Sequence, residues 1–285
     1  MRPKVFHDFS EVEADIRKKA PPVVYKYRSW KDNFHKAVLI NQAVWFSHPF
    51  DLNDPLDVRP ETIFDENQFY DNRYFQRMLK GADAQFPKYT KYQRFLAAME
   101  QWIEIKASPK IVTDNMIQWN SERGNFDSVG VFSTCSNGSN VRMWNEYGDG
   151  NKGFCIGFKT VEFCKQMNSG YGIVRYTDAP YVHNFLGADG SDYDEVHEID
   201  PLYTKKEIWS HEEEFRFITV GIGKGVSQLQ NFNTSTVAEI ILGCDISISD
   251  QEEIIQIVKD KYTPTIPVFK IQKSAPSSLA KIQVS

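Results

Sequence analysis

Three short polar segments, far apart in the chain, carry the side chains best suited to chemistry. They are the basic segment Tyr25–Arg28, the hydroxyl segment Ser133–Ser136 and the acidic segment Trp209–Arg216. A guanidinium group can clamp a phosphate, hydroxyls can hold ribose or amide groups, and carboxylates can stabilise a cationic transition state. The hypothesis from the sequence is that the three segments meet at one cleft.

The acidic segment contains a Glu-x-Glu pattern at the start of a predicted strand. Side chains two residues apart on a strand share a face, so Glu212, Glu214 and Arg216 should point one way. Phe215 and Phe217 then point into the core. Two carboxylates on one cleft wall can divide the work, because one stabilises a cationic sugar while the other orients or deprotonates an attacking group. The alternative is a surface ion pair between Glu214 and Arg216, which contributes little to stability.

The hydroxyl segment ends another predicted strand. Ser133 and Thr134 point to opposite faces there, and either hydroxyl can fix an amide or ribose group of a ligand. The alternative is structural: the strand turns into a loop, and Ser136 or Ser139 caps the helix predicted at residues 141–147. A serine-hydrolase nucleophile is not indicated, because the G-x-S-x-G elbow is absent.

In the basic segment, Lys26 and Arg28 share one face of a predicted strand, opposite Tyr25 and Tyr27. At the strand end, Arg28 is placed to clamp a phosphate with two parallel hydrogen bonds. The alternative is an ion pair of Arg28 with Asp32 or with a glutamate of the acidic segment. A phosphate-bearing ligand is therefore one of two interpretations of this segment.

A short aromatic helix and a glycine-rich turn follow the hydroxyl segment. Trp144 and Tyr147 are three residues apart, so they share one face of the helix. Core packing is the default role of such a pair, and stacking on a flat ligand is the alternative. The glycines that follow allow a tight reversal, but their spacing matches neither a P-loop nor a dinucleotide fingerprint.

The helix and strand signals predict an α+β fold in a single domain spanning residues 1–285. Strand signals flank a charged, aromatic, helix-prone segment at about residues 61–123, which we interpret as a helical insert. A polar stretch between Thr177 and Pro201 is interpreted as a mobile surface loop. The predicted strands are 23–27, 43–47, 130–133, 153–158, 172–176, 214–220, 237–242 and 266–271, and the predicted helices are 6–18, 33–41, 66–79, 91–105, 110–121, 201–209 and 252–260.

The composition narrows the class of protein. With 41% hydrophobic and 25% charged residues the chain is an ordinary globular one, and its net charge of -5 does not indicate nucleic-acid binding. The four cysteines lack metal-binding spacing, so reduced thiols and no metal site are expected. No secretory signal and no membrane-spanning run is recognisable, which predicts a cytoplasmic protein with no membrane partner.

Several pieces of the chain resemble a large, mostly bacterial family of unknown activity, domain-of-unknown-function family two-nine-seven-one. The pieces run in family order from about Tyr25 to Gly243, and the helical insert falls where such proteins usually vary. The matching pieces are YKYRSW, NQAVWFSHPFDLNDPLD, VFSTCS, MWNEYGDGNKGFCIGF, IVRY, KKEIWSHEEEFRF and IILG.

A second resemblance implies an activity. A basic residue on a first strand, Ser-Thr on a middle strand and Glu-x-Glu on a late strand resemble the R-S-E arrangement of ADP-ribosyltransferases. That fold holds NAD in the cleft of a split sheet, so the resemblance implies a split-sheet core with NAD as substrate. This chain departs from the pattern at Cys135, which interrupts Ser-Thr-Ser, and by a long polar loop before the acidic segment.

The resemblance implies a set of NAD-binding residues. Arg28, beside Tyr27, would bind the NAD phosphates. Ser133, with Thr134 next to it, would brace the nicotinamide ribose and the base of the cleft.

The resemblance also implies catalytic roles. Glu214 would stabilise the oxocarbenium-like sugar, and Glu212 would position the acceptor. The aromatic ring of Tyr147 or Trp144 would stack on the nicotinamide.

The sequence leaves three functions open. The first is an NAD-consuming enzyme that transfers ADP-ribose to a protein or nucleic acid or hydrolyses NAD, as a bacterial toxin or phage-defence effector with an immunity or antitoxin partner. The second is a non-catalytic sensor module that binds a nucleotide or a protein. The third is a metal-dependent nucleic-acid-processing enzyme, which ranks last because the chain lacks metal-ligand spacing and is acidic overall.

Overall fold

The structure is a computed structural model that describes residues 9–59, 61–186, 200–222, 228–275 and 278–285. The chain forms two compact units. Among the described residues, the helical unit lies within 53–126 and 177–205, and the sheet unit lies within 9–52, 127–176 and 206–285. All the residues proposed from the sequence for a functional site belong to the sheet unit.

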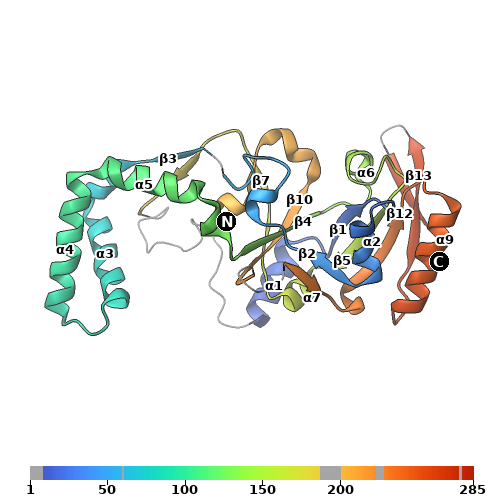
Figure 1. The fold of residues 1–285 in the computed structure, drawn as a ribbon, viewed down its shortest axis with the longest axis horizontal. Helices are drawn as coiled ribbons and strands as arrows, with labels where there is room; N and C mark the ends of the chain where they lie inside the picture. Colours follow the sequence, from blue (N-terminus) through green and yellow to red (C-terminus); the bar gives the residue numbers. More distant parts are fainter. Residues whose placement is uncertain (1–8, 60, 187–199, 223–227, 276–277) are drawn as a thin grey trace. The chain divides into compact units, whose positions relative to one another are not determined.

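The sheet unit is built on a mixed sheet of eight strands (Figure 1), and the α+β class predicted from the sequence is confirmed. Its neighbouring strands follow the order β14-β13-β12-β5-β1-β4-β10-β6, and β12 runs parallel to β13. The strands are β1 (Val23–Arg28), β4 (Val129–Cys135), β5 (Phe154–Lys159), β6 (Gly170–Ile173), β10 (Glu214–Val220), β12 (Val237–Leu242), β13 (Val268–Ala275) and β14 (Ser278–Gln283).

The sheet is split between β1 and β4. In the described chain these strands share one registered pair, Tyr25 with Cys135, whereas β1 follows β5 over its whole length from Val23 to Arg28. Farther along β4, Val131 pairs instead with Ser47. The sheet therefore consists of two fully paired parts that are joined at one position.

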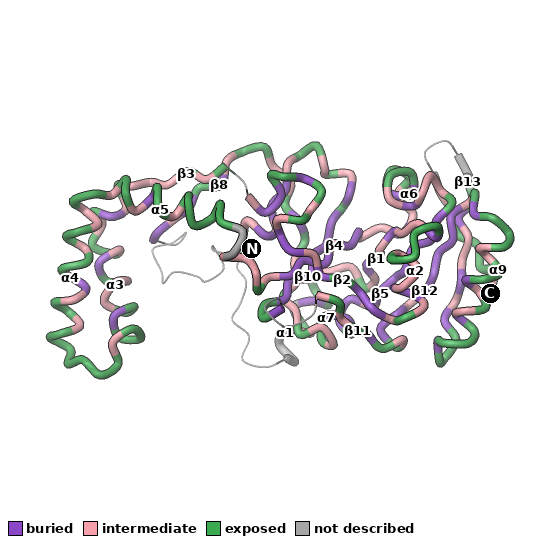
Figure 2. The backbone as a smooth tube through the Cα atoms, in the orientation of Figure 1, coloured by how far each residue is buried: buried purple, intermediate pink, exposed green. Residues whose placement is uncertain are grey.

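One face of the sheet, which we call the core face, carries the larger apolar cluster. Its strand residues lie buried beneath four helices (Figure 2), and phenylalanines dominate the packing. Phe163, for example, lies 4.5 Å from Phe158 and 4.9 Å from Phe217 between ring centroids. The helices are α1 (Phe9–Lys19), α2 (Asn33–Ile40), α7 (Thr160–Met167) and α9 (Ile248–Lys261).

The opposite face, which we call the α6 face, carries a smaller cluster around the short helix α6 (Val141–Glu146). Trp144 of α6 is fully buried there, with its ring edge-to-face against Tyr27 at 5.1 Å. Cys135, Cys155 and Ile241 complete the buried layer. Cross-strand partners point to the same face of a sheet. The β10 residue that pairs with Cys135 therefore also belongs to the α6 face.

The helical unit contains the three helices expected in the insert. Phe75, Ala82 and Ala98 are buried between two of them, and Trp102 stacks on Phe75 at 4.7 Å. Parallel strands β3 (Thr62–Phe64) and β8 (Tyr181–His183) belong to the same unit. The helices are α3 (Asn72–Gln85), α4 (Lys91–Ala107) and α5 (Pro109–Ser121).

The predicted helix 66–79 is wrong at its start. Residues Glu66–Tyr70 form a separate 3-10 turn, η2, and α3 begins after Asp71. The Asp71 carboxylate accepts a hydrogen bond from the Arg73 backbone N–H, which makes Asp71 the cap of a new helix.

The predicted helix 201–209 is also wrong. The segment forms the 3-10 turn η4 (Asp200–Tyr203), the short strand β9 (Thr204–Lys205) and a second 3-10 turn, η5 (Glu207–Glu212). The Lys205 carbonyl accepts a hydrogen bond from the Thr177 N–H at 2.9 Å, in place of a hydrogen bond within a helix. Much of the polar stretch predicted as a loop, residues 187–199, lies outside the described residues.

The close approach of β1 and β5 gives a test of the fold. A Cβ added at Gly153 would lie 2.1 Å from the Arg28 backbone oxygen, so Gly153→Ala must push β1 away from β5. We expect a loss of about 1–3 kcal/mol in the free energy of unfolding, measured by urea denaturation. The control is Gly81→Ala in α3, where the added Cβ meets nothing within 4 Å and should stabilise the helix by roughly 0.5–1 kcal/mol. Equal stability of the two variants would contradict the packing described for β1.

Candidate functional site

The candidate site lies on the α6 face, where β1, β4 and β10 are neighbours. Tyr25 pairs with Cys135, and Cys135 pairs with Glu214, so these three residues form one row across the sheet. Ser133 pairs with Arg216 one step farther along the same face. The register thus brings the hydroxyl and acidic segments side by side, next to the tyrosines of the basic segment.

Glu214 is engaged in a buried ion pair. Its two carboxylate oxygens accept hydrogen bonds from Nε and Nη2 of Arg216 at 2.7 and 3.0 Å. The exposed fraction is 3% for Glu214 and 0% for Arg216. The Glu214 backbone N–H also donates to the Tyr176 hydroxyl at 2.7 Å. The pair expected as the structural alternative is therefore present, but it is buried rather than on the surface, and it holds the carboxylate in one geometry.

Glu212 reaches the site by a different route from the one predicted. It is the last residue of η5 rather than part of β10, and Glu213 between the two glutamates has a left-handed backbone with φ of +44°. The Glu212 carboxylate is buried and accepts a hydrogen bond from the Tyr147 hydroxyl at 2.7 Å. Strand alternation consequently does not relate Glu212 to Glu214, although both belong to one turn-and-strand segment.

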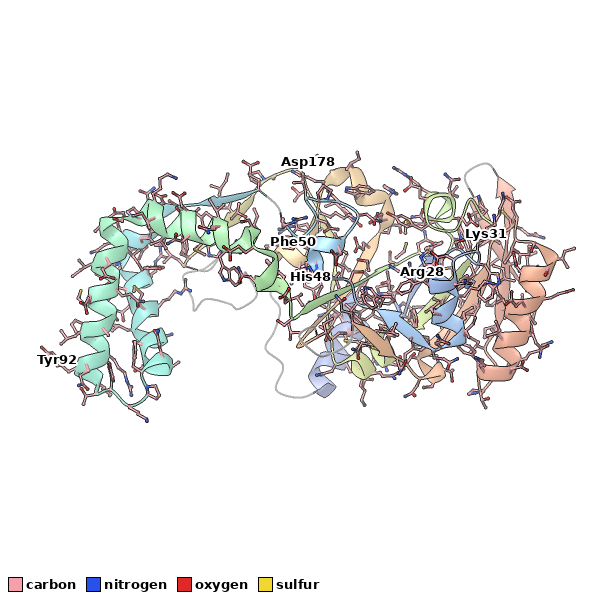
Figure 3. All side chains as sticks on the ribbon, in the orientation of Figure 1. Arg28, Lys31, His48, Phe50, Tyr92 and Asp178 are labelled. Atoms are coloured by element: carbon pink, nitrogen blue, oxygen red, sulfur yellow. The ribbon has the colours of Figure 1, made fainter. Side chains whose placement is uncertain are left out.

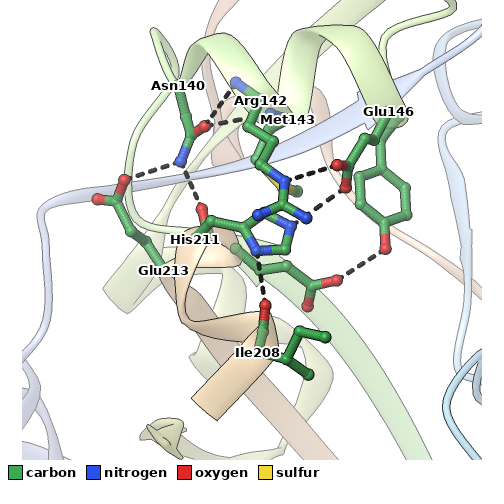
Figure 4. Close-up of polar contacts among 9 residues, drawn as sticks. Asn140, Arg142, Met143, Glu146, Ile208, His211 and Glu213 are labelled. Atoms are coloured by element: carbon green, nitrogen blue, oxygen red, sulfur yellow. Dashed lines mark hydrogen bonds and ion pairs between the residues drawn. The ribbon is translucent and has the colours of Figure 1, made fainter. Parts of the chain in front are cut away.

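Figure 4 shows how α6 and η5 are held together. The Asn140 amide donates to the His211 carbonyl at 2.7 Å and to the Glu213 carboxylate at 2.8 Å, while its oxygen caps α6. Across the same contact, His211 Nε2 lies 3.1 Å from a Glu146 oxygen. The pKa of Glu146 is lowered, mainly by its hydrogen bond from Arg142. This network fixes the acidic segment.

Sequence reasoning missed the role of Asn140, because Ser136 and Ser139 are equally good caps by residue type. The deciding signal is tertiary, since only a side chain with both an acceptor and a donor can cap α6 and bind η5 at once. The prediction of Ser136 or Ser139 as the cap is wrong.

Three residues proposed from the sequence for NAD binding are used in packing. The Thr134 hydroxyl donates to the Phe215 carbonyl at 2.7 Å on the core face. The Tyr27 hydroxyl donates to the Asn137 carbonyl at 2.5 Å, and the Trp144 indole donates to the Gly138 carbonyl at 3.0 Å. All three side chains are buried, whereas Tyr147 is only partly buried.

Ser133 is partly buried and lies at the split in the sheet. Its carbonyl accepts a hydrogen bond from the Lys26 ammonium at 2.5 Å, and the same ammonium sits 5.3 Å from the Phe132 ring centre. Lys26 therefore places a positive charge where β1 and β4 stop pairing.

Arg28 lies at the end of β1, followed by the segment that carries Lys31 (Figure 3). By alternation it belongs to the face of Lys26 and not to that of Tyr27, so the structure does not place its side chain on the α6 face with Glu214. Its hydrogen bond runs to the adjacent Tyr27 carbonyl at 3.4 Å, and no carboxylate oxygen of the described chain lies within 4.0 Å of it. Burial lowers the pKa of Arg28 to about 10, against an opposing effect of Asp32.

One comparison with known proteins finds a match that covers part of this site. Residues 143–217 match the model of the family described as Protein of unknown function (DUF2971). The matched segment contains Tyr147, Glu212, Glu214 and Arg216 but neither Arg28 nor Ser133. No curated protein matches the chain, and no solved structure matches it either. The resemblance to DUF2971 is therefore supported over a narrower range than the one from Tyr25 to Gly243.

Cys135, the cross-strand partner of Glu214, brings a thiol to this site. Burial raises the pKa of the Cys135 thiol to about 12, so little of the nucleophilic thiolate form exists at neutral pH. Within the described residues, no group of three or more His, Cys, Asp or Glu side chains is arranged to hold a metal ion. No helix of the described chain is long and apolar enough to cross a bilayer.

The buried pair on β10 leads to a stability prediction. Glu214→Ala removes the Glu214 carboxylate from the buried Arg216 guanidinium, and we expect a loss of about 3–5 kcal/mol in the free energy of unfolding. The double variant Glu214→Ala with Arg216→Met should recover most of that loss, because the buried charge that Glu214 balances is removed as well. Urea denaturation of both single variants and the double variant gives the coupling energy. A coupling energy near zero would contradict the pair.

Arg28 leads to the opposite prediction. Because burial lowers its pKa, the charged form is less stable in the folded than in the unfolded chain, and this penalty persists at neutral pH until the pH rises above about 10. Arg28→Met should therefore leave the free energy of unfolding at pH 7 unchanged or raise it. The control is Lys31→Met, an exposed cation whose loss should change stability by less than about 0.5 kcal/mol. A clear loss of stability in Arg28→Met alone would show that the guanidinium is a structural group.

Proposed function

We propose that this protein is an NAD-cleaving enzyme of the ADP-ribosyltransferase type, which transfers ADP-ribose to a macromolecule or hydrolyses NAD. One observation supports the proposal above the others: β1, β4 and β10 are neighbours, with Tyr25, Cys135 and Glu214 in one row across the sheet. The basic, hydroxyl and acidic segments thus border one part of the sheet at its split. A ligand that carries phosphates, ribose and nicotinamide needs basic, hydroxyl and carboxylate side chains close to one another.

The proposed reaction breaks the bond between the anomeric carbon of ribose and the nicotinamide nitrogen. The electron pair leaves with neutral nicotinamide, and the sugar becomes an oxocarbenium-like cation. Water or an acceptor group then attacks that carbon and loses a proton. Carboxylates beside the carbon favour this path because they stabilise the positive charge as it develops.

Two carboxylates are assigned to these steps. Glu214 stabilises the cation, and its pairing with Arg216 fixes it in position without the need to reorganise during the reaction. Glu212, held by Tyr147, orients the acceptor and accepts its proton. The Tyr147 ring is the assigned contact for nicotinamide in place of the buried Trp144.

The remaining groups are assigned to the rest of NAD. Ser133 braces the ribose from the α6 face, and Arg28 binds the phosphates as a cation that lacks a carboxylate partner in the described chain. Because Arg28 belongs to the other side of β1, the ligand must pass β1 to reach both groups.

A second candidate is a non-catalytic module that binds a nucleotide. The observation that favours it is the Glu214–Arg216 pair, because a carboxylate with both oxygens bound to a guanidinium offers less charge to a transition state. In this case a nucleotide stabilises the protein against heat and no product forms.

The test is NAD consumption by purified protein, with released nicotinamide measured by chromatography in the presence and absence of a cell lysate as acceptor source. We expect release by the wild type and a loss of roughly a hundredfold or more in Glu214→Gln, because one electrostatic contact to the transition state is removed. Glu212→Gln should reduce transfer to an acceptor more than hydrolysis.

The matched control is Glu207→Gln, the same change at an exposed position of η5, which should keep full activity. Thermal unfolding of each variant separates loss of chemistry from loss of fold. Nicotinamide release that persists in a folded Glu214→Gln protein would refute the assignment. Thermal stabilisation by NAD without any release would favour the binding module.

A further inference from the structure

Arg28 and His35 lie together beside the start of α2. The guanidinium of Arg28 is the second-largest influence on the His35 ring after burial, and both lower the pKa of His35. Lys26 acts on the ring in the same direction, and Asp32 acts in the opposite one. The geometry agrees, because Lys26 and Arg28 share one face of β1 and the His35 ring contacts Ser29, the residue after Arg28. The Asp32 carboxylate already caps α2 by accepting from the Phe34 and His35 N–H groups.

The hydrogen bonds of His35 fix its tautomer. The Ser29 backbone N–H donates to His35 Nδ1 at 3.3 Å, so in this arrangement Nδ1 is an acceptor and the ring proton belongs on Nε2. The nearest Asp32 carboxylate oxygen lies 3.9 Å from the same Nδ1. Protonation of Nδ1 would break the bond from Ser29 and turn the ring nitrogen towards Asp32 as its ion-pair partner.

Arg28 uses little of its hydrogen-bonding capacity. A guanidinium carries five N–H donors, and the bond that Arg28 makes is the 3.4 Å contact to the Tyr27 carbonyl, at the long end of the range. Arg28 is partly buried, so its remaining N–H donors are open to a ligand that can accept from them. The guanidinium presents several coplanar N–H donors, and two further basic groups lie beside it. Such an arrangement suits a phosphate or a similar oxyanion.

We infer that Arg28, Lys26 and His35 form an oxyanion site at the start of α2, and that filling this site is coupled to protonation of His35. The inference rests on the proposed function only in that the phosphates of NAD would supply the oxyanion. An anion next to Arg28 offsets the two positive charges that disfavour protonated His35, so binding should draw a proton onto the ring from solvent. By linkage, a lower pH should then raise the affinity for the oxyanion, because more of the His35 ring is protonated.

The experiment is calorimetric titration with ADP-ribose and, separately, with sulfate at about pH 6, in two buffers of different ionisation enthalpy. Neither probe titrates near that pH, so a buffer-dependent heat measures protons taken up by the protein. We expect uptake in the wild type and its loss in His35→Gln, whose side-chain oxygen can still accept from Ser29. Arg28→Met should weaken binding roughly tenfold to a hundredfold.

The control is Lys31→Gln, which removes an exposed cation from the same segment and should keep both affinity and proton uptake. Binding of ADP-ribose far tighter than sulfate assigns the site to a nucleotide, and similar binding of both assigns it to a free oxyanion. Unchanged affinity in Arg28→Met, or the same proton uptake in His35→Gln as in the wild type, would overturn the inference. Binding that behaves as expected without nicotinamide release would overturn only the proposed function.

Discussion

The single registered pair between Tyr25 and Cys135 is the constraint on which the site depends. Full pairing of β1 with β4 would satisfy the Ser133 carbonyl by a backbone N–H and leave no gap in the sheet. Since pairing stops there, the Lys26 ammonium supplies the hydrogen bond, and β4 turns to pair with Ser47. A buried carbonyl at a break in a sheet needs a donor of some kind, and a lysine satisfies it while adding a charge.

The two faces beside this break have different electrostatics. On the α6 face, acidic groups are satisfied within the protein, because Glu214 binds Arg216, Glu212 binds Tyr147 and Glu213 binds Asn140. On the other side of β1, Arg28 lacks such a partner in the described chain. The acidic half is thus already organised, and the basic half gains the most from a ligand. For the proposed enzyme, this asymmetry means that the carboxylates assigned to chemistry are held in place before the substrate binds.

The features that depend only on residues close together in the sequence could be predicted from the sequence. The bounds of β10 and the inward direction of Phe215 and Phe217 follow from alternation over a few residues, and both are confirmed. The left-handed backbone at Glu213 could not be foreseen, because a turn of this kind at a non-glycine residue is stabilised by tertiary contacts such as that of Asn140. The face of Arg28 follows from the same alternation, but its distance from the acidic segment depends on the register and the split, which no local pattern encodes.

The order of the strands also limits how the protein can be dissected. The segment that matches DUF2971 contains β5, β6 and the first half of β10, yet β1 and β4, which lie between β5 and β10 in the sheet, come from outside it. A fragment cut to residues 143–217 would keep β6 beside part of β10 but would separate both from β5, and its acidic turn would lack Asn140. The segment recognised by sequence similarity is therefore smaller than the sheet to which it belongs, and assays of isolated fragments must begin before β1 and end after β14.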